Sequence, residues 1–351
     1  MEGLRLFICA LCVNFAVGQL RQCGSQQKCV QFNECDEFKQ YVGIPSNRWP
    51  DSIKQEVKNR LCNVKQQGNS RIYSICCSET GPQSGLAMLD TKNCGKSSSE
   101  RVAFGKNAPL YRYPWMALLQ TYDGSFSCGG TLITKRYVLT AAHCGRPAII
   151  SVRLGEHDLS KVQDCIVLGD ERDCAPDPQD IAVAEFIKHK RYSPSKRKND
   201  IALIRLVSPA LINNNVNTIC LPISNFRNNP EPEKMIITGW GYTEKENRTS
   251  NVLQFVNLPI VSNSECGPTL ARLSDAISLD DDTQLCAGGT ERMDNCAGDS
   301  GGPLQYYSRT EARAVQHGIV SYGLNSCGVE SVPGVYTKVS YYIDWILQNL
   351  T

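Results

Sequence analysis

The sequence predicts a mainly β protein with a small cysteine-rich module near its N-terminal end. After residue 102, short runs rich in Val, Ile, Leu and Tyr are broken by Gly, Pro and Asn, as in 135–139, 149–154 and 235–238. Six cysteines lie within residues 23–77, a segment too short to bury a comfortable apolar core. Disulfides are the usual remedy at that size, so we expect a disulfide-stapled module followed by a larger β domain.

Residues 1–18 have the pattern of a secretory signal peptide. Arg5 precedes an apolar run from Leu6 to Val17, which ends among small residues and predicts cleavage before Gln19. A membrane anchor is the alternative, but spanning a bilayer takes about 20 apolar residues and this run is shorter. No later run is long enough either, so the sequence predicts a secreted, extracellular protein without a membrane span.

Cysteine usage agrees with an oxidising compartment. Of the 18 cysteines, Cys9 and Cys12 lie in the signal segment, and the remaining 16 suffice for eight disulfides. Zinc binding is the alternative, but Cys and His pairs at ligand spacing are missing and the chain has only four histidines. The net charge of +2 gives no reason to expect a nucleic-acid partner.

The cysteine-rich module contains one helical pattern. Residues 51–61 place Ile53, Val57 and Leu61 on one stripe, which predicts a short helix. Spacing alone leaves the connectivity of the six cysteines open.

Residues 79–101 have no hydrophobic periodicity and contain Gly81-Pro82 and several serines, which predicts a flexible linker. The linker ends at Arg101-Val102, and mobile polar segments of this kind are preferred sites of proteolysis.

The run from Asp294 to Leu304 contains Gly-Asp-Ser-Gly-Gly around Ser300. A serine hydroxyl is a weak nucleophile until a base takes its proton and N–H donors hold the oxyanion. The glycines permit a sharp turn that aims the N–H groups of Gly298 and Ser300 at one point, an oxyanion hole. A glycine-rich surface turn is the alternative, but upstream segments carry His143 (Thr-Ala-Ala-His-Cys) and Asp200 (Asn-Asp-Ile-Ala-Leu).

These motifs make residues 102–351 resemble the chymotrypsin-fold serine proteases of the S1 family, which share the chain order His, Asp, Ser. The resemblance implies two six-stranded β-barrels. The spacing of apolar residues in 341–350 adds a C-terminal helix. The resemblance also implies that Ser300 is the nucleophile and that His143 is the general base and then acid. Asp200 would fix the imidazole tautomer, and no cofactor is required for this chemistry.

The resemblance assigns a specificity pocket. Asp294, six residues before Ser300, would lie at its base, and Gly323 and Gly334 would leave its walls open. A buried carboxylate is costly unless a cation pairs with it, so this pocket selects Arg or Lys side chains.

The resemblance also implies a zymogen. Cleavage after Arg101 would free the amine of Val102 to pair with the Asp299 carboxylate and order the loops of the oxyanion hole.

The adjacent Cys76-Cys77 pair, which closes a six-cysteine module ahead of a protease, resembles an arthropod CLIP domain. The organisation is then a signal peptide (1–18), a CLIP domain (19–78), a linker (79–101) and a protease domain (102–351). The resemblance implies eight disulfides: Cys23–Cys76, Cys29–Cys62, Cys35–Cys77, Cys94–Cys220, Cys128–Cys144, Cys165–Cys174, Cys266–Cys286 and Cys296–Cys327.

Two surface features remain open. Gly-Glu-His-Asp at 155–158 resembles the start of the calcium loop of trypsin-like proteases, with Glu156 and Asp158 as oxygen ligands; a solvated acidic loop is the alternative. Asn247-Arg248-Thr249 is a glycosylation sequon, which makes Asn247 a candidate glycosylation site.

The sequence therefore predicts a secreted trypsin-like serine endopeptidase zymogen that cuts after Arg or Lys. Its resemblance to CLIP proteases implies a place in haemolymph cascades of arthropod immunity, in prophenoloxidase activation for melanisation or Toll-ligand processing. Implied partners are an upstream activating protease, a substrate zymogen or cytokine precursor, and a serpin inhibitor. The alternatives are a non-catalytic CLIP homologue that acts as a binding cofactor, a developmental cascade protease and a digestive protease.

Overall fold

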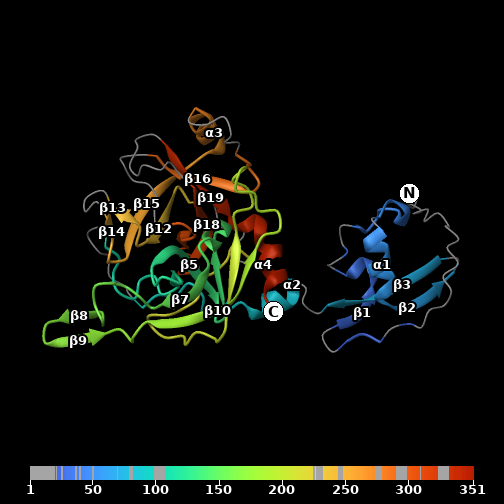
Figure 1. The fold of residues 1–351 in the computed structure, drawn as a ribbon, viewed down its shortest axis with the longest axis horizontal. Coiled ribbons are helices and arrows are strands. Elements are labelled where there is room, and N and C mark those ends of the chain that lie inside the picture. Colours follow the sequence, from blue (N-terminus) through green and yellow to red (C-terminus); the bar gives the residue numbers. More distant parts are fainter. Residues whose placement is uncertain are drawn as a thin grey trace. The chain divides into compact units, whose positions relative to one another are not determined.

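The computed structural model forms two compact units, one of residues 1–86 with 350–351 and one of residues 87–349. Each unit is described by itself (Figure 1). No helix among the described residues is both long enough and apolar enough to cross a membrane. The structure describes residues 20, 22–24, 27–35, 38, 41–49, 51–68, 70–78, 82–98, 107–223, 226, 232–243, 248–272, 279–289, 299–308, 310–322 and 332–351.

The smaller unit is a three-stranded antiparallel sheet with one helix. The sheet has the order β1 (Gln27–Gln31), β3 (Ser70–Ser78), β2 (Leu61–Gln67), and the helix is α1 (Asp51–Asn59). The stripe predicted for this helix packs on a core of Cys35, Phe38, Ile75 and Cys77. Three disulfides staple the sheet: Cys23–Cys76, Cys29–Cys62 and Cys35–Cys77.

The larger unit contains two closed six-stranded barrels, so the predicted fold class is confirmed. The first barrel consists of β10 (Gln179–Lys188), β11 (Ala202–Leu206), β6 (Tyr137–Thr140), β5 (Phe126–Thr134), β4 (Met116–Thr121) and β7 (Ile149–Leu154). The second consists of β12 (Lys234–Gly239), β15 (Gln254–Val261), β16 (Gln284–Gly288), β19 (Pro333–Lys338), β18 (Arg313–Tyr322) and β17 (Pro303–Ser308).

Smaller elements decorate the barrels. The hairpin of β8 and β9 is closed by Cys165–Cys174 and projects from the unit (Figure 1). The C-terminal helix predicted over 341–350 is present as α4, after a single 3₁₀ turn. The remaining bounds are β8 (Cys165–Leu168), β9 (Glu171–Cys174), β13 (Tyr242–Thr243), β14 (Arg248–Thr249), α2 (Pro82–Met88), α3 (Asn263–Ala271) and α4 (Ile343–Asn349).

Buried side-chain hydrogen bonds join the two barrels. Trp115, just before β4, donates its indole N–H to Oε1 of Gln305 on β17 at 2.8 Å. Thr131 on β5 donates to Oε1 of Gln316 on β18 at 2.6 Å. All four residues are at most 1% exposed, so each polar atom depends on its partner across the barrels. These bonds fix the register in which the two barrels present their loops.

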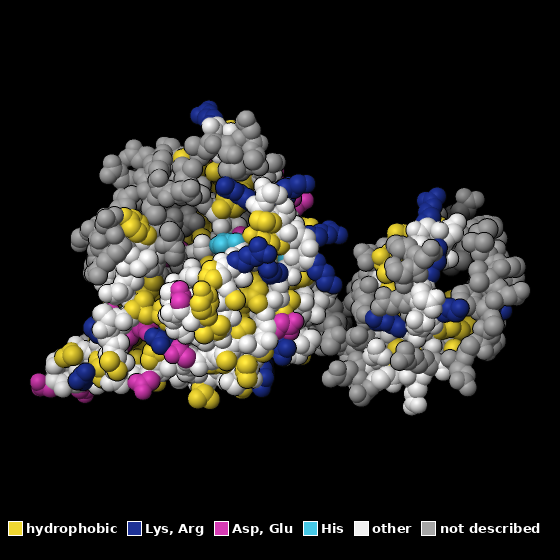
Figure 2. Space-filling view, viewed as in Figure 1, with side chains coloured by type: hydrophobic (Ala, Val, Ile, Leu, Met, Phe, Trp, Pro, Cys, Tyr) yellow, Lys and Arg dark blue, Asp and Glu magenta, His cyan; other side chains and the backbone are white. Residues whose placement is uncertain are grey.

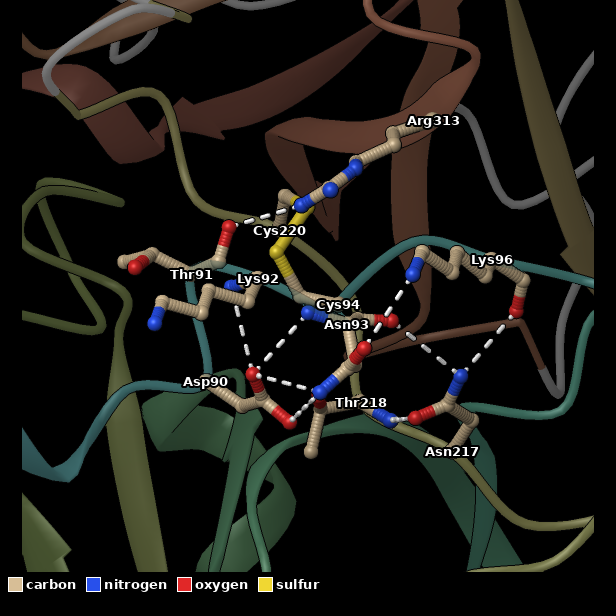
Figure 3. The surroundings of a disulfide bond; sticks show 10 residues. All are labelled: Asp90, Thr91, Lys92, Asn93, Cys94, Lys96, Asn217, Thr218, Cys220 and Arg313. Atoms are coloured by element: carbon tan, nitrogen blue, oxygen red, sulfur yellow. Dashed lines mark hydrogen bonds between the residues drawn. A yellow bond between two sulfur atoms is a disulfide. The ribbon is translucent and has the colours of Figure 1, made fainter.

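The segment between the cysteine-rich module and residue 99 differs from the predicted flexible linker. Pro82 begins helix α2, which suits proline because the first helical N–H has no intrahelical partner. The anchored segment, residues 90–97, is then bonded along its length to other parts of the larger unit (Figure 3). The composition of this segment indicated a flexible linker. Its bonding partners lie more than a hundred residues away in the chain, so the local sequence gives no sign of them.

The anchored segment is held by one disulfide and by backbone contacts. Cys94 is bonded to Cys220, as the resemblance implies. Gly95 donates to the carbonyl of Thr218 at 2.7 Å and accepts from Ala314 N–H at 2.9 Å. Its φ of +69° and its approach to the Ala314 backbone leave no room for a Cβ atom. Side chains add to this: Arg313 donates to Thr91 O, and Asn217 donates to Lys96 O.

Candidate active site

His143 and Asp200 meet at the end of the first barrel. His143 lies in a 3₁₀ turn, Ala142–Gly145, directly after β6, and Asp200 lies just before β11. Strands β6 and β11 are paired, so the two loops emerge side by side. Nδ1 of His143 is 2.8 Å from Oδ2 of Asp200, and the His143 backbone N–H donates to Oδ1 at 2.9 Å.

The Asp200 carboxylate is buried, with 5% of the residue exposed. Besides its two bonds from His143 it accepts one from the Ser321 hydroxyl at 2.6 Å, and Thr337 donates to its backbone carbonyl. A buried carboxylate is stable when donors surround it, and these donors fix its orientation. Ser321 was not predicted as a partner of Asp200, because a contact between residues 121 apart leaves no periodic signal in the sequence.

Ser300 lies in a tight turn before β17. The next residue, Gly301, has a φ of +79°, and a Cβ atom there would overlap Thr140 Oγ1 and the Gly129 carbonyl. The Ser300 carbonyl accepts from Gly129 N–H on β5 at 2.8 Å, and Gly301 N–H donates to Val320 O on β18 at 2.9 Å. The turn is therefore held from both barrels.

Strands β5 and β18 connect the Ser300 turn to the segments that carry His143 and Asp200. On β5, Gly129 holds Ser300, while the adjacent Cys128 is bonded to Cys144, the neighbour of His143. That disulfide lies within 4.8 Å of a His143 ring nitrogen. On β18, Val320 holds the turn after Ser300, while the adjacent Ser321 holds Asp200. An imidazole oriented by a carboxylate beside a serine turn is the arrangement that removes a hydroxyl proton.

The Asp299 carboxylate points toward the end of β12. Its Oδ1 accepts from Gly241 N–H at 2.9 Å, and Cβ atoms at positions 239 and 241 would both overlap it. Glycine at these two positions makes room for a charged side chain. Val102, its predicted partner, lies outside the described residues.

Of the three residues predicted to form the specificity pocket, only Gly334 is among the described residues. Gly334 is a buried residue of β19 and pairs with Ala287 of β16. The neighbouring disulfide Cys266–Cys286 ties α3 to β16. The described residues thus contain seven of the eight implied disulfides. Outside the described residues lie the signal segment, Arg101, Asn247, Asp294, Gly298, Gly323 and the Cys296–Cys327 pair.

The acidic loop predicted as a calcium site pairs with cations of the protein itself. Arg153 donates to Glu156 at 3.3 Å and makes a two-bond contact with Asp180 at 2.8 Å. Lys161 lies 2.9 Å from Asp158. Burial raises the pKa of the Glu156 carboxyl. For Asp158 burial acts in the same direction, but hydrogen bonds from Ser160 and Lys161 outweigh it and hold the pKa below its usual range.

These acidic residues do not form a ligand set. Among the described residues, no three carboxylates bring their oxygens within 4.8 Å of one another. Calcium binding needs six to eight oxygens, about 2.3–2.6 Å from the ion. The described carboxylates therefore supply at most part of such a set, because Glu156 and Asp158 are held in ion pairs with Arg153 and Lys161.

Comparison with known proteins agrees with this geometry. Residues 102–346 match the trypsin family. The chain is 40% identical to phenoloxidase-activating factor 3 of Holotrichia diomphalia, over 93% of this chain and 92% of that protein. It is 37% identical to the Spaetzle-processing enzyme of Drosophila melanogaster, over 86% and 80%. The crystal structure of the Drosophila Grass clip serine protease of the Toll pathway matches with a TM-score of 0.68 and 32% identity, over 93% of this chain and 94% of that one.

Proposed function

Because this chain belongs to the trypsin family, and within it to the CLIP-domain serine proteases, we propose that it is a secreted zymogen. Cut after Arg101, it hydrolyses peptide bonds that follow Arg or Lys. The observation that carries the proposal is the buried Asp200 carboxylate, which holds His143 by two hydrogen bonds. A histidine that only packs in the fold does not need a buried carboxylate bonded to its ring nitrogen next to a serine turn.

The chemistry follows from this geometry. With Nδ1–H donated to Asp200, His143 leaves Nε2 as the basic atom that takes the proton from Ser300 Oγ. Oγ attacks the scissile carbonyl carbon, and the N–H groups of Gly298 and Ser300 hold the oxyanion. His143 then returns the proton to the leaving amine, and a water molecule repeats the sequence on the acyl-enzyme.

Activation uses the site around Asp299. Cleavage after Arg101 creates the Val102 ammonium, and the carboxylate held by Gly241 is its partner. Because Asp299 adjoins Ser300, this ion pair orders the backbone that carries the oxyanion hole.

The immune cascade role rests on relatives. One similar protein is named for phenoloxidase activation and another for Spaetzle processing. We propose an extracellular cascade protease with an upstream activating protease, a substrate zymogen or cytokine precursor, and a serpin inhibitor. A non-catalytic CLIP homologue is disfavoured because His143, Asp200 and Ser300 are all present and held by common strands. A developmental cascade uses the same chemistry and remains the second candidate.

Cleavage at residue 101 is expected to switch the activity on. The zymogen is produced with Arg101 replaced by the recognition sequence of another protease, which is then used to cut it. We expect hydrolysis of small Arg and Lys amides, and not Phe amides, to rise at least about a hundredfold, because oxyanion donors are each worth about that much. The uncut protein is the control. A cut, folded sample that hydrolyses none of these amides would reject the catalytic proposal.

Calcium is expected to have no effect on this protein. The Glu156 and Asp158 carboxylates already pair with Arg153 and Lys161, so an added ion has no preformed ligand set to occupy. Thermal unfolding of the zymogen in millimolar calcium and in EDTA should give the same Tm. A stabilising shift of several degrees with calcium, lost in Glu156→Gln, would contradict this prediction.

A further inference from the structure

The connection from β10 to Asp200 is strongly basic. Six of its eleven residues are Lys or Arg, from Lys188 to Lys198, and none is acidic. We call residues 188–198 the basic loop. Five of these side chains are exposed, and the sixth, Lys198, lies 3.7 Å from Asp280. Figure 2 shows Lys and Arg side chains gathered on one side of the larger unit, next to a histidine. The exposed cations of the basic loop have no ion pair among the described residues.

The basic loop is held against the predicted active site. His189 packs on Tyr342 and Trp345, and Asn199 donates to the Arg191 carbonyl at 3.0 Å. Bonds between Ser193 and Lys198 close it into a narrow turn. Asp200 follows two residues after Lys198, so the end of the basic loop leads into the His143–Asp200 pair.

Arg197 has the most constrained position in the basic loop. Its φ of +50° is uncommon for a residue with a long side chain. Its carbonyl accepts from Gln284 on β16 at 2.9 Å, and its guanidinium lies over the Tyr322 ring, 4.8 Å from the centroid. Backbone strain of this kind persists where surrounding contacts impose it, and it is common at functional sites.

Tyr322 connects the basic loop to the path of the substrate. It ends β18, follows Ser321, which is bonded to Asp200, and precedes Gly323 of the proposed pocket wall. An extended peptide whose Arg side chain enters that pocket would add along this segment. The residues before the cleaved Arg would then lie against Tyr322 and the guanidinium of Arg197.

We propose that the basic loop selects protein substrates with acidic side chains in the few residues before the cleaved Arg, with Arg197 as the central contact. The proposal rests on the proposed protease function and adds a substrate class to it. Exposed cations close to an active site attract and orient anionic groups, and each such contact is worth a few-fold in affinity. A sulfated polysaccharide is the other anion that a basic surface can bind. The contact of Arg197 with Tyr322, which adjoins the proposed pocket wall, favours a peptide.

The test compares two fluorogenic peptides that end in the same Arg and carry three Asp or three Asn before it. With the cut protein at low salt, we expect kcat/KM to be at least about tenfold higher for the Asp peptide, because several few-fold contacts combine. The ratio should fall toward one as salt rises, because exposed charges are screened.

Matched variants locate the effect. Lys190→Gln/Lys196→Gln/Arg197→Asn removes three charges, and Asn tolerates the positive φ at position 197. Lys135→Gln/Lys234→Gln/Arg272→Asn removes three exposed charges elsewhere. The ratio of kcat/KM for the Asp peptide to that for the Asn peptide should fall to about one only in the first variant. Both variants should still hydrolyse a simple Arg ester. A ratio near one in the unsubstituted protein, or one unchanged by the first variant, overturns the proposal.

Binding separates this inference from the proposed function. Anisotropy measures how tightly the two peptides bind the cut Ser300→Ala protein. Suppose that the cut, unsubstituted protein does not hydrolyse the Arg ester, while the Ser300→Ala protein binds the Asp peptide more tightly than the Asn peptide and loses this difference in the loop variant. The acidic preference then stands and the protease proposal fails. Equal binding of both peptides, alongside binding of a sulfated polysaccharide that the loop variant abolishes, overturns the acidic-substrate proposal.

Discussion

Replacing Ser300 with alanine is expected to lower kcat of the cut protein about a millionfold, the loss seen when a hydrolase of this type loses its nucleophile. The Ser300 turn is held by backbone hydrogen bonds alone: Gly129 N–H donates to the Ser300 carbonyl, and Gly301 N–H donates to the Val320 carbonyl. Neither bond uses the Ser300 side chain. The variant should therefore fold normally. Hydrolysis of a small Arg amide is the measurement, with thermal unfolding as the check on folding.

Ser208→Ala is the matched control, because this serine is exposed. Its kcat should equal that of the unsubstituted protein. If Ser300→Ala retained more than about a thousandth of the activity, Ser300 would not be the nucleophile.

The second large effect is expected at Asp200. Asp200→Asn should lower kcat about ten-thousandfold, because an amide N–H toward Nδ1 forces the imidazole into the wrong tautomer. The His143 backbone N–H still finds the amide oxygen at the position of Oδ1. The Ser321 hydroxyl, which shares Oδ2 with Nδ1, can rotate to accept a hydrogen bond from the amide nitrogen, so the loop geometry should survive. KM for a small Arg amide should change far less than kcat, because Asp200 does not touch the substrate.

Asp177→Asn is the control for the same chemical change at an exposed position. It should leave kcat unchanged. If Asp200→Asn and Asp177→Asn had similar activities, the Asp200–His143 contact would be structural only.

Much of the fold could be predicted from local sequence patterns. The apolar run at 149–154 is strand β7. The stripe of the 51–61 segment packs on the core of its unit, although α1 ends at Asn59 and Leu61 begins β2. Such patterns work because burial imposes a period of 2 on strands and 3.6 on helices. The pairing of Cys94 with Cys220 came from family resemblance, because spacing does not determine connectivity.

Contacts distant in the chain were not predictable in the same way. The Ser321–Asp200 bond joins two barrels, and the anchoring of residues 90–97 depends on Asn217 and Arg313. The basic loop was hidden for a different reason. A net charge of +2 sums over the whole chain, so acidic residues elsewhere cancel a local cluster of six cations.

The anchored segment has a consequence for how an activated molecule behaves in solution. Under the proposed cleavage after Arg101, Cys94 would stay bonded to Cys220 and keep the cysteine-rich module tethered to the protease unit. We expect a protein that binds this module to be tethered to the protease unit as well, and a short tether gives an effective concentration in the millimolar range. We expect a substrate that binds the module weakly to be cleaved as fast as a more abundant free substrate. A cut molecule whose module has no bound partner should cleave the same protein more slowly.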